Sequence, residues 1–342
     1  MLHFENAACL DCGAPLGFLP GDMYLTTVAR MPDGTLEPAS RPGERWRPCA
    51  NAGDALCNWL LPAASEEEFC LACRFNRTIP DLSVPRNVEL WREVEAAKRR
   101  LVYAMLRFGL PMVAWRDDPE GGLAFDFLAD TEDERFLTGH AGGVVTINIA
   151  EADPVERERR RVALREPLRT VLGHLRHEIA HYYWDVLVRD NKRVATSRRV
   201  FGDDSADYGA ALEAYYRDGP PADWWKSHVS EYATAHAYED FAETWTHYLH
   251  MVDTLDTAAS FGLQVAPGVA SHPRFSAQVP EDPYQCVFFD DLARAWRPIT
   301  VAVNGLNRSM GQPDLYPFSL SPIAKEKLGV IHLLVRATMP GD

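Results

Sequence analysis

Residues 177–181 read His-Glu-Ile-Ala-His, and this pentapeptide constrains the fold and chemistry of the 342-residue chain more than any other segment. On an α-helix, four residues advance about 400°, so His177 and His181 would lie one turn apart on nearly the same face. Both imidazoles could then bind one Zn²⁺, with Glu178 beside them as a candidate general base. The alternative is a surface helix with two unrelated histidines. A helical context and a third metal ligand would favour the metal site.

The segment around the pentapeptide has the pattern of a helix. Apolar residues recur at spacings of three and four from Leu168 to Val186, which is typical of a helix packed into a core. Pro167 is compatible with a first helical turn, where its missing N–H costs nothing. His177 and His181 lie at the border of the apolar stripe, where a metal in a partly buried cleft would need them.

The composition is ordinary for a soluble globular protein, with 46% hydrophobic and 25% charged residues. No run approaches 18 apolar residues, so we expect no transmembrane helix and no membrane partner. The N-terminus lacks a basic region followed by an apolar one, so we expect a cytoplasmic protein without a secretion signal. The net charge of −14 argues against nucleic acid as a partner, because phosphate binding needs a basic surface.

Six of the seven cysteines precede residue 74, and this clustering suggests a metal site more than disulfides in a chain without a secretion signal. Two Cys-x-x-Cys pairs open and close the segment, and two such pairs supply the four thiolates of a closed, tetrahedral structural zinc site. The predicted ligands are Cys9, Cys12, Cys70 and Cys73. Cys49 and Cys57 could instead replace one pair, build a second site, or be buried small apolar residues.

These cysteines define a predicted zinc-ribbon module of residues 1–80. The module contains 6 Arg and no Lys against 10 acidic residues. A DNA-reading role is therefore disfavoured, and a scaffold or a docking site for a protein partner fits better. The proline-bounded segment 80–85 is a plausible linker to a second domain, residues 81–342.

The second domain is predicted to begin with a helix near Asn87. Short strands are expected at Met112–Trp115, Leu123–Leu128 and Val144–Ile149, and the pattern is mainly helical from about residue 200 onward. A small sheet ahead of the His-Glu-x-x-His helix fits a zinc peptidase, in which an edge strand pairs with an extended substrate.

A catalytic zinc also needs a third protein ligand and an open position for water. Glu239 and Glu243 are four residues apart in a second amphipathic helical segment and so share a face. We predict that Glu239 binds zinc and that Glu243 accepts an imidazole N–H, which would fix the ligand's tautomer and orientation. Two alternatives remain open: Asp185 on the motif's own helix, or a distant histidine. The candidate histidines are His228, His236, His247 and His250.

His-Glu-x-x-His on one helix and Glu-x-x-x-Glu on a later one resemble the gluzincin metallopeptidases. Three segments together resemble the bacterial "putative zinc-binding metallopeptidase" family with an N-terminal zinc ribbon. They are the His-Glu-x-x-His motif, Phe201-Gly-Asp-Asp-Ser-Ala-Asp-Tyr, and Glu-Asp-Phe-Ala-Glu-Thr-Trp-Thr-His-Tyr-Leu-His-Met. This resemblance covers essentially the whole chain. It implies an α+β fold, in which a small zinc ribbon precedes a mainly helical, gluzincin-like (zincin) metallopeptidase domain with a small sheet.

The resemblance also implies roles for single residues. In gluzincins of the lethal-factor type, the first acid of a Glu-x-Phe-Ala-Glu stretch is the zinc ligand. The resemblance therefore implies that Glu239 is the ligand here and that Glu243 supports it. The same comparison implies that Tyr232 is a catalytic tyrosine, with Tyr238 as a rival candidate.

The resulting hypothesis is a zinc-dependent peptidase with one catalytic and one structural zinc ion and a peptide or protein substrate. Zinc would lower the pKa of its bound water from 15.7 toward about 7. Glu178 would take the proton and deliver it to the leaving amine, while zinc and Tyr232 stabilise the oxyanion. The alternative is a zinc-dependent binding or regulatory protein on a peptidase fold without significant turnover. The intact Glu178 favours the enzyme.

Overall fold

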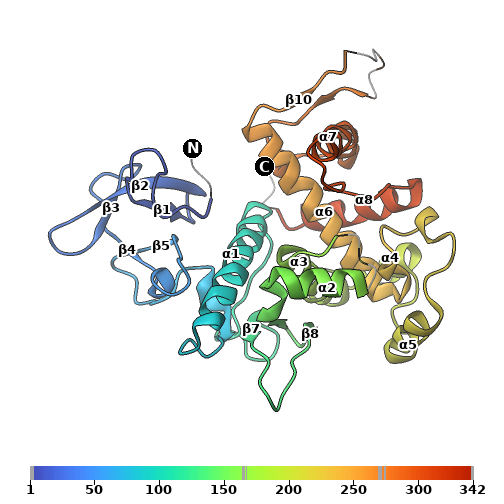
Figure 1. Ribbon diagram of the computed structural model, residues 1–342, viewed down its shortest axis with the longest axis horizontal. Helices are drawn as coiled ribbons and strands as arrows, with labels where there is room; N and C mark the ends of the chain where they lie inside the picture. The colour runs from blue at the N-terminus through green and yellow to red at the C-terminus, as the bar shows by residue number, and fades with distance from the viewer. Residues whose placement is uncertain (1–3, 164–165, 167, 269–271, 273–274, 340–342) are drawn as a thin grey trace. The chain divides into compact units, whose positions relative to one another are not determined.

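The computed structural model describes residues 4–163, 166, 168–268, 272 and 275–339. The chain divides into two compact units, which are described separately below. Unit 1 comprises Met1–Arg107, Met112–Ala163 and Thr170–Leu175, and unit 2 comprises Phe108–Pro111, Leu164–Arg169 and Arg176–Asp342. The predicted α+β class is confirmed, because strands dominate the N-terminal region and helices dominate the rest (Figure 1). The predicted domain boundary at residue 80 stays a prediction.

Unit 1 begins with a five-stranded antiparallel sheet in the order β1-β2-β3-β4-β5. A small apolar cluster of Leu19, Val28 and Leu60 holds its strands together. Gly17 is required in β1, because a Cβ atom there would lie 2.4 Å from Cδ1 of Leu60. The strands are β1 (Leu16–Leu19), β2 (Tyr24–Arg30), β3 (Leu36–Pro38), β4 (Trp46–Pro48) and β5 (Leu60–Pro62).

The predicted helix near Asn87 is confirmed as α1 (Pro85–Arg107), which begins with a proline in its first turn. A four-stranded sheet in the order β6-β7-β9-β8 belongs to the same unit. Its strands are β6 (Asn76–Thr78), β7 (Ala124–Leu128), β8 (Gly139–Ala141) and β9 (Val144–Asn148). Strands β7 and β9 lie within two of the predicted strands, β6 and β8 were not predicted, and Met112–Trp115 forms only an isolated bridge between Ala114 and Leu123.

The pairing of β8 with β9 depends on two glycines. Strand β8 runs antiparallel to β9, whereas β6, β7 and β9 are parallel. The two-residue turn between β8 and β9 consists of Gly142 and Gly143, both with positive φ. This conformation is the one that suits a tight hairpin and costs glycine nothing. Unit 1 ends with the short helix α2 (Pro154–Ala163) and the first residues of α3.

Unit 2 is built around two helices that carry the sequence motifs. Helix α3 (Val171–Trp184) begins three residues after Leu168, where the predicted helical pattern starts, and Pro167 lies outside the described residues. A π-helical turn (Asp185–Arg189) follows it directly. Helix α6 (Ala237–Ser260) buries its predicted apolar side, and its Trp245 stacks on Tyr183 of α3 at 5.0 Å between ring centroids. These contacts fix the two helices against each other.

Further helices complete unit 2 (Figure 1). They are α4 (Val194–Phe201), α5 (Tyr208–Asp218), α7 (Phe289–Ser309) and α8 (Pro322–Arg336), with a two-stranded pair of β10 (Gln264–Val265) and β11 (Ala277–Gln278). Helix α8 packs on α6, where Tyr248 bonds to Nδ1 of His332 at 3.0 Å. In the parts of the chain that the structure describes, no helix combines the length and the apolar character needed to span a bilayer.

Candidate metal centres

Helices α3 and α6 bring together the three ligands predicted for a catalytic metal. His177 and His181 lie one turn apart on α3, and Glu239 lies in the first turn of α6. Oε2 of Glu239 is 2.9 Å from Nε2 of His177, and its Oε1 is 3.8 Å from Nε2 of His181. A zinc ion 2.0–2.1 Å from tetrahedrally arranged ligands separates the ligand atoms by about 3.4 Å. The three residues therefore fit a zinc ion.

The charges of this group also suit a cation. Burial raises the pKa of Glu239, but its hydrogen bond to His177 and the charges of His177 and His181 outweigh burial and lower the pKa to about 2. Burial lowers the pKa of His177, whereas hydrogen bonds to Glu239 and Glu243 raise it well above its usual value. An ionised, buried carboxylate thus faces two imidazoles, and a dication would supply the positive charge that this carboxylate attracts.

Glu243, one turn after Glu239 on α6, holds the ring of His177. Its Oε1 lies 2.8 Å from Nδ1 of His177, and its Oε2 accepts a hydrogen bond from the hydroxyl of Ser230 at 2.5 Å. The Ser230 oxygen in turn accepts the N–H of Ala233 at 3.2 Å. A ring bonded through Nδ1 presents Nε2 to the metal group.

Glu178 is half-buried on α3 beside His177. Burial raises the pKa of the Tyr208 and Tyr238 phenols, and nearby carboxylates, Glu178 among them, raise it further. Glu178 does not belong to the group of three ligand atoms.

The two predicted tyrosines occupy different places. The ring of Tyr232 lies 5.8 Å from the ring of His177, and burial followed by the charge of Glu239 raises the pKa of its phenol. The ring of Tyr238 stacks on His181 at 4.2 Å, and its hydroxyl donates to the backbone oxygen of His181 at 3.3 Å. Tyr238 thus uses its hydroxyl to hold the helix, whereas the ring of Tyr232 lies beside that of His177.

A third tyrosine, Tyr208, was missed by the sequence reasoning. Its hydroxyl donates to Oε1 of Glu239 at 2.6 Å. Tyr208 is the last residue of the Phe-Gly-Asp-Asp-Ser-Ala-Asp-Tyr segment and follows Asp207, the N-cap of α5. The signal available in the sequence was membership of that segment, but a tyrosine in a motif does not by itself identify its partner.

The alternative third ligands have other partners. Asp185 lies in the π-helical turn and pairs with Arg189 at 2.7 Å. Each candidate histidine bonds outside the metal group: His228 to Ser227, His236 to Ala206, His247 to Tyr316 and His250 to Arg176.

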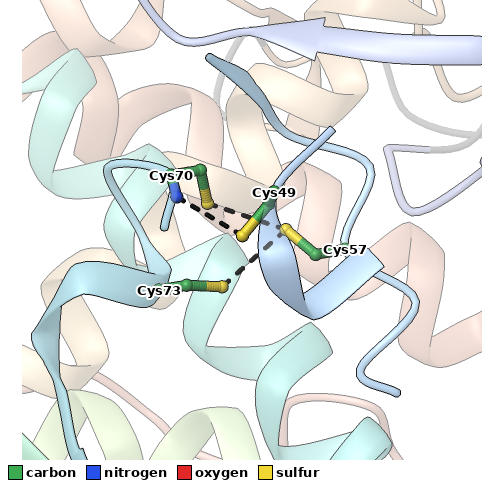
Figure 2. Close-up of side chains that lie close together, drawn as sticks. All are labelled: Cys49, Cys57, Cys70 and Cys73. Atoms are coloured by element: carbon green, nitrogen blue, oxygen red, sulfur yellow. Dashed lines mark hydrogen bonds between the residues drawn. The ribbon is translucent and has the colours of Figure 1, made fainter. Parts of the chain in front are cut away.

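Four buried cysteines form a second group in unit 1 (Figure 2). The sulfur of Cys57 lies 3.6 Å from that of Cys70 and 3.8 Å from that of Cys73. The N–H of Cys70 donates to the sulfur of Cys49 at 3.3 Å. Tetrahedral zinc with Zn–S bonds of about 2.3 Å places sulfurs about 3.8 Å apart. The cysteines therefore fit a closed four-thiolate site.

This group differs from the predicted one, because Cys49 and Cys57 take the places expected for Cys9 and Cys12. The N-terminal pair lies outside the group, in a turn where Gly13 donates its N–H to the oxygen of Cys9 at 2.9 Å. The reason is strand pairing. Cys49 directly follows β4 and Cys57 precedes β5, and these two strands are antiparallel neighbours. Pairing of β4 with β5 brings the two cysteines together, which their spacing in the sequence does not reveal.

A buried ion pair on α1 lies against the four cysteines. Glu95 and Lys98 both have fully buried side chains, and Nζ of Lys98 is 2.8 Å from Oε1 of Glu95. The other oxygen of Glu95 lies 3.8 Å from the sulfur of Cys73. Lys98 places a cation next to a cluster that becomes negatively charged when its thiols ionise.

Comparisons with known proteins match the two metal groups separately. A family model described as "Putative zinc-binding metallo-peptidase" matches residues 87–334, and one described as "zinc-ribbon domain" matches residues 1–84. Uncharacterised proteins of Mycobacterium bovis and of two strains of Mycobacterium tuberculosis are each 41% identical over 340 residues, which is 99% of this chain and 93% of theirs. No solved structure matches the chain. The histidine–glutamate group lies in the first match, and the four cysteines lie in the second.

Proposed function

The chain belongs to this zinc-binding metallo-peptidase family and carries a zinc-ribbon domain. We propose that it hydrolyses peptide bonds of a substrate at a zinc ion bound by His177, His181 and Glu239. The observation that supports this most is the grouping of these three ligands with Glu178 beside them. Three protein ligands leave one tetrahedral position open, which is typical of catalytic zinc. When bound, zinc lowers the pKa of a water molecule toward about 7 and polarises the substrate carbonyl.

Glu178 acts as the general base. It follows His177 directly in the sequence, so its carboxylate starts from the same turn of α3 as the first ligand. It takes a proton from the attacking water and then delivers that proton to the leaving amine. Glu243 and Ser230 keep the ring of His177 oriented during this exchange.

Tyr232 donates to the oxyanion that forms as the carbonyl is attacked. Burial, reinforced by the charge of Glu239, raises the pKa of its phenol, so the hydroxyl keeps its proton at neutral pH. A fixed donor in a partly buried site stabilises developing negative charge better than water does.

The ribbon holds a structural zinc ion at Cys49, Cys57, Cys70 and Cys73. Four thiolates fill a tetrahedral site and leave no position for a substrate. The proposed substrate is a peptide or protein, and the ribbon is a candidate docking site for a protein partner. The net charge of −14 supports a substrate other than nucleic acid.

The test compares the wild-type chain with the Glu178→Gln variant on a broad peptide library, with zinc measured per chain. The variant should keep both zinc ions and lose turnover by about 10²- to 10⁴-fold, the usual contribution of a general base. Glu158→Gln, an exposed glutamate on α2, is the matched control and should cleave like the wild type. Wild-type rates in Glu178→Gln would contradict the mechanism. A wild-type chain that holds two zinc ions and cleaves nothing would favour a binding or regulatory protein.

The ligand assignment has its own test. Glu239→Ala should bind one zinc ion fewer than the wild type, because the ribbon site does not involve Glu239. Retention of both ions in Glu239→Ala would reject this carboxylate as a ligand.

A further inference from the structure

We propose that Tyr208 is a positioning residue for the catalytic metal, because its hydroxyl orients the carboxylate of Glu239. The proposal rests on the proposed metal site but does not require that the protein cleaves peptides. The Tyr208 hydroxyl donates to Oε1 of Glu239 at 2.6 Å, while Oε2 lies 2.9 Å from Nε2 of His177. The two oxygens of one carboxylate therefore have different tasks.

The Glu239 side chain cannot readily replace this hydrogen bond. Glu239 is only 1% exposed, so water has little access to its oxygens. Without the phenol, the carboxylate could rotate and exchange Oε1 for Oε2 in front of the histidines. Outer partners of metal-binding carboxylates and imidazoles fix the ligands in this way, and their loss typically costs 10- to 100-fold in metal affinity.

His236 links the backbone of Ala206, two residues before Tyr208, to the backbone of Tyr238, the neighbour of Glu239. Its Nδ1 accepts the N–H of Tyr238 at 3.1 Å and so caps α6, three residues before Glu239. Its Nε2 lies 3.2 Å from the oxygen of Ala206, just before α5. The ring of Tyr208 meets the ring of His236 edge to face, with centroids 5.4 Å apart. One imidazole thus contacts the beginnings of both helices.

The packing of α5 supports the same role. None of the residues of α5 is buried, so the helix adds no side chain to the core of unit 2. Instead its tyrosines reach the site: Tyr208 bonds to Glu239, and Tyr215 lies 5.7 Å from the ring of Tyr232. Gly202 and Gly219, both with positive φ, bracket the segment that contains α5. Helix α5 thus contacts the metal group through Tyr208 and the neighbouring Tyr232 through Tyr215.

The role of Tyr208 is distinct from that of Tyr232. The Tyr208 hydroxyl is engaged by a ligand carboxylate, so it is not free to donate to the substrate in this arrangement. A positioning residue changes how tightly the metal is held. A residue that contacts the reacting atoms changes the rate once the metal is in place.

The experiment measures zinc affinity by competition with a chelator in the full chain. Tyr208→Phe keeps the ring and removes only the hydroxyl. We expect one of the two zinc ions to bind 10- to 100-fold more weakly, while the ribbon zinc stays bound and reports that the chain is folded. Tyr216→Phe on the same helix is the control, and its zinc affinity should equal that of the wild type, because Tyr216 has no bond to a ligand carboxylate among the described contacts. Equal affinity in Tyr208→Phe and the wild type would overturn the proposal.

A second measurement separates positioning from catalysis. With zinc in excess, Tyr208→Phe should regain the wild-type kcat, because only the metal requirement has changed. A kcat that stays low at saturating zinc, together with unchanged zinc affinity, would reject the positioning role. If the wild type shows no peptidase activity at all, the affinity measurement still decides the role of Tyr208.

Discussion

The imidazole of His177 lies between two carboxylates, with Nδ1 2.8 Å from Oε1 of Glu243 and Nε2 2.9 Å from Oε2 of Glu239. Only one of these carboxylates belongs to the metal group. The other is held by Ser230 and fixes which nitrogen faces the metal. Glu239 has an outer partner of the same kind in Tyr208. Two of the three residues of the metal group therefore hydrogen-bond to side chains outside the group.

Replacing Glu243 should weaken zinc at this site without affecting the ribbon. In Glu243→Ala, Nδ1 of His177 loses its partner, so we expect zinc affinity to fall 10- to 100-fold at the histidine–glutamate site. Calorimetric titration of chains that retain the ribbon zinc would measure this. Ser230→Ala removes only the support of Glu243 and should cause a smaller loss. An affinity unchanged by Glu243→Ala would show that His177 needs no such anchor.

The identity of the ribbon ligands can be decided by counting metal in two variants. Cys57→Ser removes one of the four grouped sulfurs and should leave one zinc ion per chain. Cys12→Ser changes a cysteine outside the group and should leave two. Elemental analysis after dialysis would give both numbers. The opposite result, with zinc lost only in Cys12→Ser, would restore the pairing first predicted from the Cys-x-x-Cys motifs.

Breaking the buried ion pair on α1 should lower the stability of the fold. Lys98→Met removes the nearer of the two cations that pair with the fully buried Glu95 and leaves only Arg99, at 3.9 Å, so we expect the free energy of unfolding to fall by about 3 kcal/mol. Arg100 on the same helix pairs with Glu5 at the surface, and Arg100→Met should cost at most about 1 kcal/mol. Urea denaturation would compare the two. Equal losses would mean that Lys98 and Glu95 do not stabilise the fold as a buried pair.

The N-cap of α5 should influence both this helix and the metal. Oδ1 of Asp207 accepts the N–H of Ala210 at 2.9 Å, and Asp207→Ala should destabilise α5 by about 1 kcal/mol. Because α5 has no buried residues, this loss should appear as faster amide exchange in residues 208–218 and as weaker zinc binding. Asp218→Ala, at the other end of the helix, should change neither. Faster amide exchange with unchanged zinc affinity would show that the stability of α5 does not affect the metal site.

The lowered pKa of His247 predicts that the stability of the fold depends on pH. Burial lowers the pKa of its imidazole to about 4, against an ordinary value near 6.5. Above pH 6.5 the ring is neutral in both the folded and unfolded states. As the pH falls from 6.5 to 4, only the unfolded state gains the proton, so stability should decrease by roughly 3 kcal/mol. Unfolding free energies of the wild type and His247→Asn across this range would show it. Parallel pH profiles of the wild type and His247→Asn would contradict a lowered pKa of His247.

The parts of the site that depend on helical periodicity were predictable from sequence. A spacing of four residues places His177 near His181 and Glu239 near Glu243 whatever the rest of the chain does. The apolar stripe of α6 then determines which side of the helix faces the core. The same reasoning locates α1, because its apolar residues also recur at helical spacing.

The remaining features depend on contacts between elements. Cys49 approaches Cys57 because β4 pairs with β5, and strand pairing is not encoded in the spacing of cysteines. Tyr208 meets Glu239 where His236 contacts the chain at the starts of α5 and α6. Such contacts arise from loop conformations, which short-range patterns do not specify.

The enclosure of the four cysteines bears on how this protein acquires its metals. None of the four exposes more than 4% of its surface, so an ion has no open route to them in the folded chain. Their zinc would be captured during folding and released only when the ribbon opens. In the second group His177 is 12% exposed, whereas His181 and Glu239 are 6% and 1% exposed, so among these three ligands only the His177 side lies near solvent. The two ions would then leave by different routes: the first only when the ribbon opens, and the second past the ring of His177.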